Sequence, residues 1–188
     1  MASLTTPRCD FGWNAKDFNL LSVDGSYWSP SLALGERGLV IMFICNHCPY
    51  VKAILDRLIS DIEDLRSIGV NAIAISSNDV ESYPDDSYEN MQKIALLRNF
   101  NFPYLFDGTQ EVARDYNAIC TPDFFGFNQN LELQYRGRFD STGRGEPSES
   151  HERDLFNAMK VIAETKSGPT QQLHSIGCSI KWKEINQI

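Results

Sequence analysis

The sequence predicts an α/β protein with a mixed central sheet flanked by helices, on three observations. A continuous apolar run at residues 39–45 has the length of a strand that is covered on both faces. Apolar residues then recur at helical spacing from Val51 to Leu65, and a second apolar run spans residues 70–76. A strand, a helix and a strand in this order form a βαβ unit with parallel strands and a right-handed crossover.

The other elements follow from local patterns around this unit. Residues 18–29 predict an N-terminal β-hairpin, because Asp24-Gly25 supplies the positive φ angles of a tight turn. Downstream, the patterns predict a helix at roughly 88–100 after an acidic loop, a strand within 102–108, a short helix carrying Val112 and Tyr116, two strands within 120–140 joined around Asn128-Gln129-Asn130, and a last helix at 149–166. We therefore expect one domain at 1–166, followed by a C-terminal extension at 167–188.

Composition narrows the classes of partner and compartment. Lys and Arg number 17 against 25 Asp and Glu, and the net charge of −8 argues against binding to nucleic acid or an anionic membrane. No run approaches the roughly 20 apolar residues of a membrane span, and the N-terminus shows no secretory signal pattern. Five cysteines are an odd number and too sparse for a secreted disulfide scaffold. We expect a cytoplasmic protein.

The stretch FICNHCPYVK at residues 43–52 carries the clearest chemistry. Cys45 falls at the carboxyl end of the central strand and Cys48 in the first turn of the next helix, the edge at which open α/β sheets place their sites. A helix N-terminus favours thiolate over thiol through its unpaired N–H groups and its positive partial charge. Pro49 suits that first turn, because the N–H that it lacks would have no partner there.

The stabilisation that a helix N-terminus supplies is too small to account for a redox-active thiolate. Lowering a cysteine pKa from ~8.5 to ~3.5–7 requires roughly 2 to 7 kcal/mol, whereas a helix terminus usually supplies ~0.3 to 1. Cys48 donating to Cys45, backbone N–H groups and a protonated His47 are candidates for the remainder. His47 could equally be a solvent-facing loop residue. We assign Cys45 as the attacking thiol and Cys48 as the resolving one, because a residue at the end of a strand is normally the more exposed.

A zinc site is the main competitor for the cysteine pair. Structural zinc needs four ligands, usually from two knuckles, and the sequence holds no second CxxC or HxxxH pair. The other potential ligands are scattered along the chain: Cys9, Cys120, Cys178, His151 and His174. A redox-active disulfide, with no metal and no other cofactor, is the better prediction.

These residues resemble the thioredoxin superfamily, and more closely the CxxC-containing peroxiredoxin-like proteins of the alkyl hydroperoxide reductase and thiol-specific antioxidant (AhpC/TSA) group. The likeness covers about residues 15–165 and rests on Cys45-Asn46-His47-Cys48, on the hairpin and βαβ order, and on Thr121-Pro122. It implies a thioredoxin-like fold with a cis-proline at Pro122 facing the dithiol. It also implies that Asn46, Thr121 and Pro122 contribute to substrate binding, with the Thr121 backbone offered to a substrate strand. Without the resemblance, Pro122 is simply a strand entry.

The likeness also implies roles for two further cysteines. Cys120 should lie near the dithiol, and the stretch GCSIKWK around Cys178 resembles the tail of the same proteins, so either could be an additional redox thiol. The alternative for each is a small buried apolar residue.

The sequence departs from the family patterns in two ways. The peroxiredoxin pattern Pro-x3-Thr-x2-Cys is absent, since counting back from Cys48 gives Cys45 and Ile41. The buried acid that thioredoxins keep on the strand before the dithiol is missing as well, which leaves water or His47 as the general base.

The predicted function is that of a thiol–disulfide oxidoreductase. The Cys45–Cys48 dithiol would exchange disulfides with a protein or a small-molecule partner, and the thioredoxin or glutathione system would be its reductant. The alternatives are a peroxiredoxin-like thiol peroxidase with antioxidant activity and a non-catalytic module that binds partners or zinc. Disulfide exchange requires a sulfur that a partner can reach.

Overall fold

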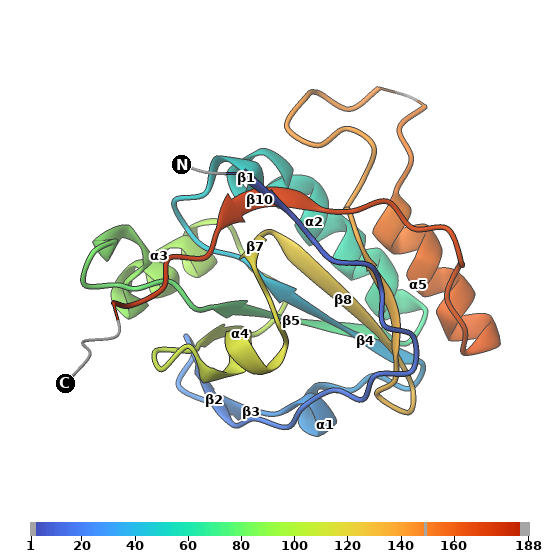
Figure 1. Cartoon of the computed structure of the whole chain (residues 1–188), viewed down its shortest axis with the longest axis horizontal. Coiled ribbons are helices and arrows are strands. Elements are labelled where there is room, and N and C mark those ends of the chain that lie inside the picture. The colour runs from blue at the N-terminus through green and yellow to red at the C-terminus, as the bar shows by residue number, and fades with distance from the viewer. Residues whose placement is uncertain (1–2, 149, 185–188) are drawn as a thin grey trace.

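The computed structural model describes residues 3–148 and 150–184, and its centre is a seven-stranded mixed sheet (Figure 1). The strands lie in the order β3-β2-β6-β5-β4-β8-β9. Their bounds are β2 Leu20–Ser22, β3 Tyr27–Trp28, β4 Gly38–Phe43, β5 Val70–Ser76, β6 Tyr104–Phe106, β8 Asp123–Asn128 and β9 Leu133–Gly137. β4, β5 and β6 run parallel, while β8 pairs antiparallel to β4. The predicted α/β class and its mixed sheet are confirmed.

The predicted βαβ unit is β4, helix α2 (Pro49–Ser67) and β5. Every residue of β4 is buried, as expected of a strand covered on both faces. Its side chains alternate between two apolar cores: Val40 and Met42 face one core, while Leu39, Ile41 and Phe43 face the other. The alternation fixes the register of the central strand, because a slip of one residue would exchange the two faces.

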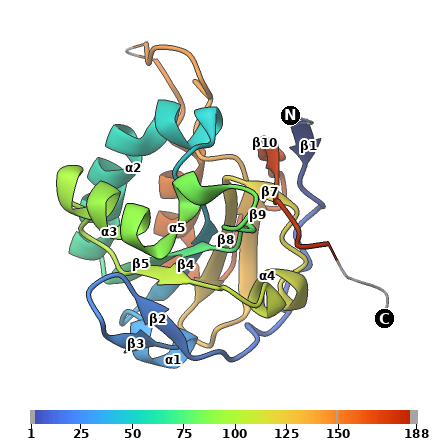
Figure 2. The ribbon, with the colours of Figure 1, turned by 90° about the vertical axis from the view of Figure 1, so that its left-hand side faces the viewer.

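Helices cover both faces of the sheet (Figure 2). The core that includes Val40 is closed by α2, α3 (Tyr88–Leu97) and α5 (Asp154–Thr165), and the opposite core by α1 (Pro30–Ala33) and α4 (Glu111–Asp115). α3 ends earlier than the apolar pattern predicts, and Asn99 just beyond it has a φ of 50°. α5 starts at Asp154; residue 149, the predicted start, lies outside the described residues.

A second sheet joins the two ends of the chain, and the sequence did not predict it. Strand β10 (Ile176–Ser179) lies between β1 (Ser3–Thr5) and β7 (Cys120–Thr121), and both of its pairings are antiparallel. In Figure 1 the red β10 crosses over the yellow β7 beside the blue β1. The expected tail therefore packs against the strand that leads into Pro122.

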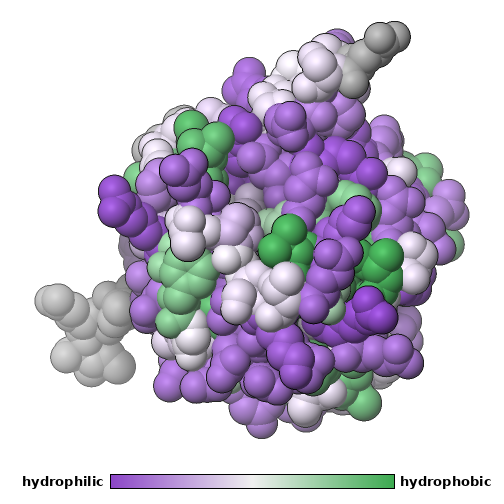
Figure 3. Space-filling view, turned by 90° about the vertical axis from the view of Figure 1, so that its right-hand side faces the viewer, coloured by the Kyte–Doolittle hydropathy of each residue, from purple (hydrophilic) through white to green (hydrophobic). Residues whose placement is uncertain are grey.

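The surface gives no sign of a membrane span within the described ranges. None of their helices combines the length and apolar character that crossing a bilayer requires. The face over α5 is mostly hydrophilic, with hydrophobic side chains in small separate patches (Figure 3).

Candidate active site

The CxxC pair lies at the junction of β4 and α2. Beyond the end of β4, the Ile44 amide still donates to the Ile75 carbonyl at 3.0 Å, which carries the extended path to Cys45. Cys48 is the N-cap of α2, and Pro49 is the first helical residue. The sequence placed Cys48 within the first turn, one position further along.

Both cysteines are buried free thiols. Cys45 is 2% exposed and Cys48 0%. Cys45 is the slightly more exposed of the two, as expected, but a difference this small does not decide which sulfur a partner reaches first. A partner larger than a small molecule reaches them only if part of the cover moves.

The local charges favour Cys48 as the thiolate. Its pKa is lowered to about 5, chiefly by a hydrogen bond from the Cys45 thiol, with further donors that include the Val51 amide and the Cys178 thiol. The pKa of Cys45 is raised well above its usual value, because Cys45 gives that hydrogen bond, is buried and faces the Asp86 carboxylate. The two groups titrate as a pair, and the directions of their shifts favour Cys45 as the holder of the remaining proton. The sequence gave the attacking role to Cys45, whereas these pKa shifts favour Cys48 as the attacking thiol.

Thr121 touches both sulfurs. Its hydroxyl lies 3.4 Å from Cys45 Sγ, and its carbonyl accepts from the Cys48 thiol at 3.1 Å. The contact with the carbonyl stabilises the protonated form of Cys48. The lowered pKa therefore means that the hydrogen-bond donors around the sulfur outweigh this contact. The Thr121-Pro122 peptide is cis, as the resemblance implied. The Thr121 backbone, expected to be open to a substrate strand, is paired with Cys178 of β10.

His47 is held by a carboxylate that the sequence had not assigned. Asp86 is fully buried at the end of the short 3₁₀ helix Pro84–Asp86, just before α3. One of its oxygens accepts from the backbone amides of Asn46 and His47 at 2.8 and 3.2 Å. The other lies 2.6 Å from His47 Nδ1 and accepts from the Asn78 side chain at 2.8 Å. Asp86 thus sets both the CxxC backbone and the orientation of the imidazole.

The second nitrogen of the His47 ring, Nε2, is buried. Among the described residues, no polar atom is hydrogen-bonded to this buried Nε2. The ring stacks on Tyr83, with centroids 5.5 Å apart and planes 10° from parallel. Since Asp86 occupies Nδ1, the arrangement is that of a general base held by a carboxylate.

Three donor atoms near the dithiol resemble part of a metal site. One atom each from Cys45, His47 and Asp86 lie within 4.8 Å of one another. A structural zinc site requires four ligands, and here the imidazole and the carboxylate are hydrogen-bonded to each other. Their contact fits a proton-carrying pair better than a metal centre.

Asn46 is used inside the protein. Its side-chain amide donates to the Asp85 carbonyl at 2.9 Å, and its oxygen accepts from the Tyr104 hydroxyl at 3.1 Å. The structure therefore gives Asn46 a role in fixing the CxxC loop, and its predicted contact with a substrate stays a prediction.

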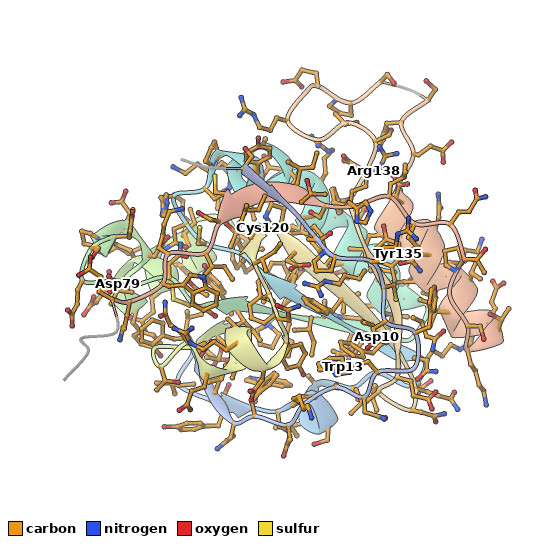
Figure 4. All side chains as sticks on the ribbon, in the orientation of Figure 1. Asp10, Trp13, Asp79, Cys120, Tyr135 and Arg138 are labelled. Atoms are coloured by element: carbon orange, nitrogen blue, oxygen red, sulfur yellow. The ribbon has the colours of Figure 1, made fainter. Side chains whose placement is uncertain are left out.

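The two additional cysteines have different surroundings. Cys120 is fully buried on β7, next to β10 (Figure 4), and its pKa is raised by burial and then by Asp123. Cys178 lies opposite Thr121 on β10, and its pKa is raised to about 11 by burial and then by the Cys48 sulfur. The structure thus brings Cys45, Cys48 and Cys178 together.

Sequence reasoning missed Asp86, although it had noted the acidic loop. The carboxylate that thioredoxins carry on the preceding strand is replaced here by one that comes from 41 positions after Cys45. A neighbouring proline and two adjacent acids were the available signal, but no local pattern says which residue they face.

Comparison with family models decides the family. The model of the AhpC/TSA family matches residues 11–139. The chain belongs to the AhpC/TSA family. No curated protein matches it.

Solved structures agree on the fold. An uncharacterized conserved protein of Geobacillus kaustophilus is 41% identical, with 97% of each chain covered and a TM-score of 0.92. A hypothetical protein of Sinorhizobium meliloti is 32% identical, covering 95% of this chain and 98% of that one, with a TM-score of 0.86. The thioredoxin domain of a thiol-disulfide oxidoreductase from Bacteroides vulgatus is 13% identical, covering 81% and 97%, with a TM-score of 0.62. The fold is thioredoxin-like, and AhpC/TSA membership supports redox chemistry of thiols.

Proposed function

We propose that this protein is a thiol–disulfide oxidoreductase whose nucleophile is Cys48 and whose resolving thiol is Cys45. The observation that carries the proposal is the pairing of two thiols at the start of α2, with the Cys48 pKa lowered to about 5. At neutral pH such a sulfur is an anion, and the thiolate is the attacking species in disulfide exchange.

The exchange proceeds in two steps that balance. The Cys48 thiolate attacks a partner disulfide, one partner sulfur leaves as a thiolate and takes up a proton, and the other stays bonded to Cys48. Cys45 then loses its proton and attacks Cys48, which releases the second partner thiol and leaves a Cys45–Cys48 disulfide. Two electrons pass from the dithiol to the partner. Reduction by a thioredoxin or glutathione system reverses the sequence.

His47 is the proposed acceptor of the Cys45 proton. An atom of its side chain lies within 4.8 Å of the Cys45 sulfur, a gap that one bridging water spans. Asp86 stabilises the imidazolium that forms, since its carboxylate is 2.6 Å from Nδ1. This pair supplies the general base that the strand preceding the dithiol lacks.

A redox titration tests the proposal. Reduced protein is equilibrated in glutathione buffers of graded potential, quenched with acid, and its thiols are assigned by mass spectrometry. We expect a single two-electron transition that joins Cys45 to Cys48. Cys9→Ser, which removes a thiol on another part of the fold, should leave this transition unchanged, whereas Cys45→Ser and Cys48→Ser should remove it. Failure of the wild-type protein to form the Cys45–Cys48 disulfide at any potential would refute the proposed function.

The burial of both sulfurs favours a second candidate, a thiol peroxidase. A cavity of about 20 Å³ borders Cys45, which admits a molecule of about the size of water. In this reaction one of the two cysteines attacks a hydroperoxide, becomes a sulfenic acid and releases water or an alcohol. The other cysteine then condenses with it and releases water. Rapid consumption of hydrogen peroxide, with slow reduction of disulfide substrates, would select this activity. The proposed compartment for either reaction is the reducing cytoplasm.

A further inference from the structure

The tail strand β10 occupies the backbone edge beside the dithiol. It pairs antiparallel with β7, with Cys178 opposite Thr121 and Ser179 opposite Cys120. Thr121 is the residue whose carbonyl contacts Cys48. An extended substrate that pairs with Thr121 would place one of its residues where Cys178 now lies.

Cys178 makes this position chemically active. It lies directly opposite Thr121, whose carbonyl is 3.1 Å from the Cys48 sulfur, and both cysteines belong to the same buried cluster. The Cys48 sulfur is also among the groups that raise the pKa of Cys178. Cys48 also interacts directly with Cys45. The Cys48 sulfur therefore has two neighbouring thiols, Cys45 from the CxxC loop and Cys178 from the tail.

We propose that Cys178 is a second resolving thiol, which moves the disulfide from Cys45–Cys48 to Cys48–Cys178 and so ties β10 to the active site. The inference rests on the proposed function, because it begins from the oxidised dithiol. The Cys178 thiolate attacks Cys48, the bond between Cys45 and Cys48 breaks, and Cys45 leaves as a thiolate that takes up the proton lost by Cys178. No electrons are gained or lost, so no further oxidant is needed.

The position of the tail is coupled to the His47 and Asp86 pair. The buried Asn78 donates to Asp86 at 2.8 Å and accepts from the Lys181 backbone amide at 2.8 Å. Lys181 is the second residue after the end of β10. One side chain therefore connects the strand that carries Cys178 to the carboxylate that orients His47, so displacement of β10 removes a partner from this network.

Disulfide mapping of Cys45→Ser tests the proposal without altering Cys178. The variant is oxidised with limiting diamide, quenched with acid, alkylated, and digested without reduction. We expect the peptides of Cys48 and Cys178 to be joined, with the loss of two hydrogens from the intact protein. Cys45→Ser/Cys9→Ser should behave in the same way. A glutathione adduct or a free thiol at Cys48, with Cys178 fully alkylated, would overturn the inference.

Gly177 offers a test that leaves all thiols in place. A Cβ at this position would collide with the Thr121 carbonyl, so Gly177→Ala should push β10 away from β7. We expect a several-fold lower yield of the Cys48–Cys178 disulfide in a Cys45→Ser background, and faster alkylation of Cys48. The matched control is Gly145→Ala, whose new Cβ would lie 3.4 Å from its nearest neighbour in an exposed loop. An unchanged yield in Gly177→Ala would contradict the role of strand pairing in the exchange.

Failure of this inference can be told apart from failure of the proposed function. If Cys178 is only a buried hydrogen-bond donor, wild-type protein still forms the Cys45–Cys48 disulfide, while Cys45→Ser forms no internal disulfide. If the dithiol is not redox-active, the wild-type protein itself forms no disulfide at Cys45.

Discussion

Two buried carboxylates at the same end of the sheet differ in their partners: Asp123 pairs with an arginine and Asp86 with a histidine. Asp86 and Asp123 are both fully buried. Asp123 accepts from Arg136 at 2.9 Å, and that guanidinium also lies 4.3 Å from the centre of the Phe125 ring. Asp86 is held by backbone amides, a side-chain amide and His47. One carboxylate faces a permanent cation, and the other faces a group that can gain or lose a proton.

The difference separates a structural ion pair from a proton-carrying one. Arg136 keeps its charge at every accessible pH, so its pair with Asp123 fixes the strand that begins directly after Thr121-Pro122. Burial raises the pKa of Asp123, and Arg136 acts against that shift. An imidazole can gain or lose a proton, so a carboxylate beside His47 can support proton transfer.

The largest effect should come from breaking the structural pair. Arg136→Met leaves the buried Asp123 without its cation, and we expect a loss of about 3 to 5 kcal/mol in the free energy of unfolding. Urea denaturation of the reduced protein measures it. Arg98→Met, which removes an ion pair with the exposed Asp56, is the control and should cost less than about 1 kcal/mol. Equal losses in the two variants would show that the buried Arg136–Asp123 pair stabilises the fold no more than an exposed ion pair does.

A smaller effect, on rate, is expected at the other carboxylate. Asp86→Asn keeps the size of the side chain but removes the charge that stabilises protonated His47. We expect the resolving step to slow about a hundredfold, the lower end of the ~10² to 10⁴ supplied by general bases. Stopped-flow measurement of mixed-disulfide decay against pH checks it, because a merely structural role would not alter the pH profile. Asp85→Asn, at an exposed neighbour, is the control, and an equal slowing there would argue against Asp86.

The smallest effect is expected at Thr121. Thr121→Val retains the shape of the side chain and removes the hydroxyl 3.4 Å from Cys45. A hydrogen bond of this kind contributes about 0.5 to 1.5 kcal/mol, which corresponds to roughly 10 to 30 mV in a two-electron potential. Equilibration with glutathione measures the shift. A change above about 100 mV would mean that the substitution also disturbs the β7 and β10 pairing.

The main elements were predictable because their signals are local. β4, α2 and β5 carry continuous apolar runs or helical periodicity, and the structure reproduces Val70–Ser76 as predicted. β10 has only four residues and obtains its partners from Ser3–Thr5 and Cys120–Thr121, far away in the sequence. No local pattern encodes such a pairing.

The active site divides in the same way. The CxxC spacing and its place at a helix start were visible in the sequence, as was Thr121-Pro122. The order of the two cysteine pKa values could not be predicted from the sequence. It depends on hydrogen-bond donors that only the tertiary fold brings close to Cys48, among them the Cys178 thiol. Asp86 was missed for the same reason.

The central claim is that Cys48 is the low-pKa nucleophile of a redox dithiol. It is tested most directly by the pH dependence of iodoacetamide labelling of the fully reduced protein, with labelled peptides assigned by mass spectrometry. A lowered pKa means that the thiolate fraction rises as pH increases through about 5, so we expect Cys48 to react first, at a rate that levels off by about pH 7. Labelling of Cys45 before Cys48, or a Cys48 rate that still rises through pH ~8.5, would contradict the account.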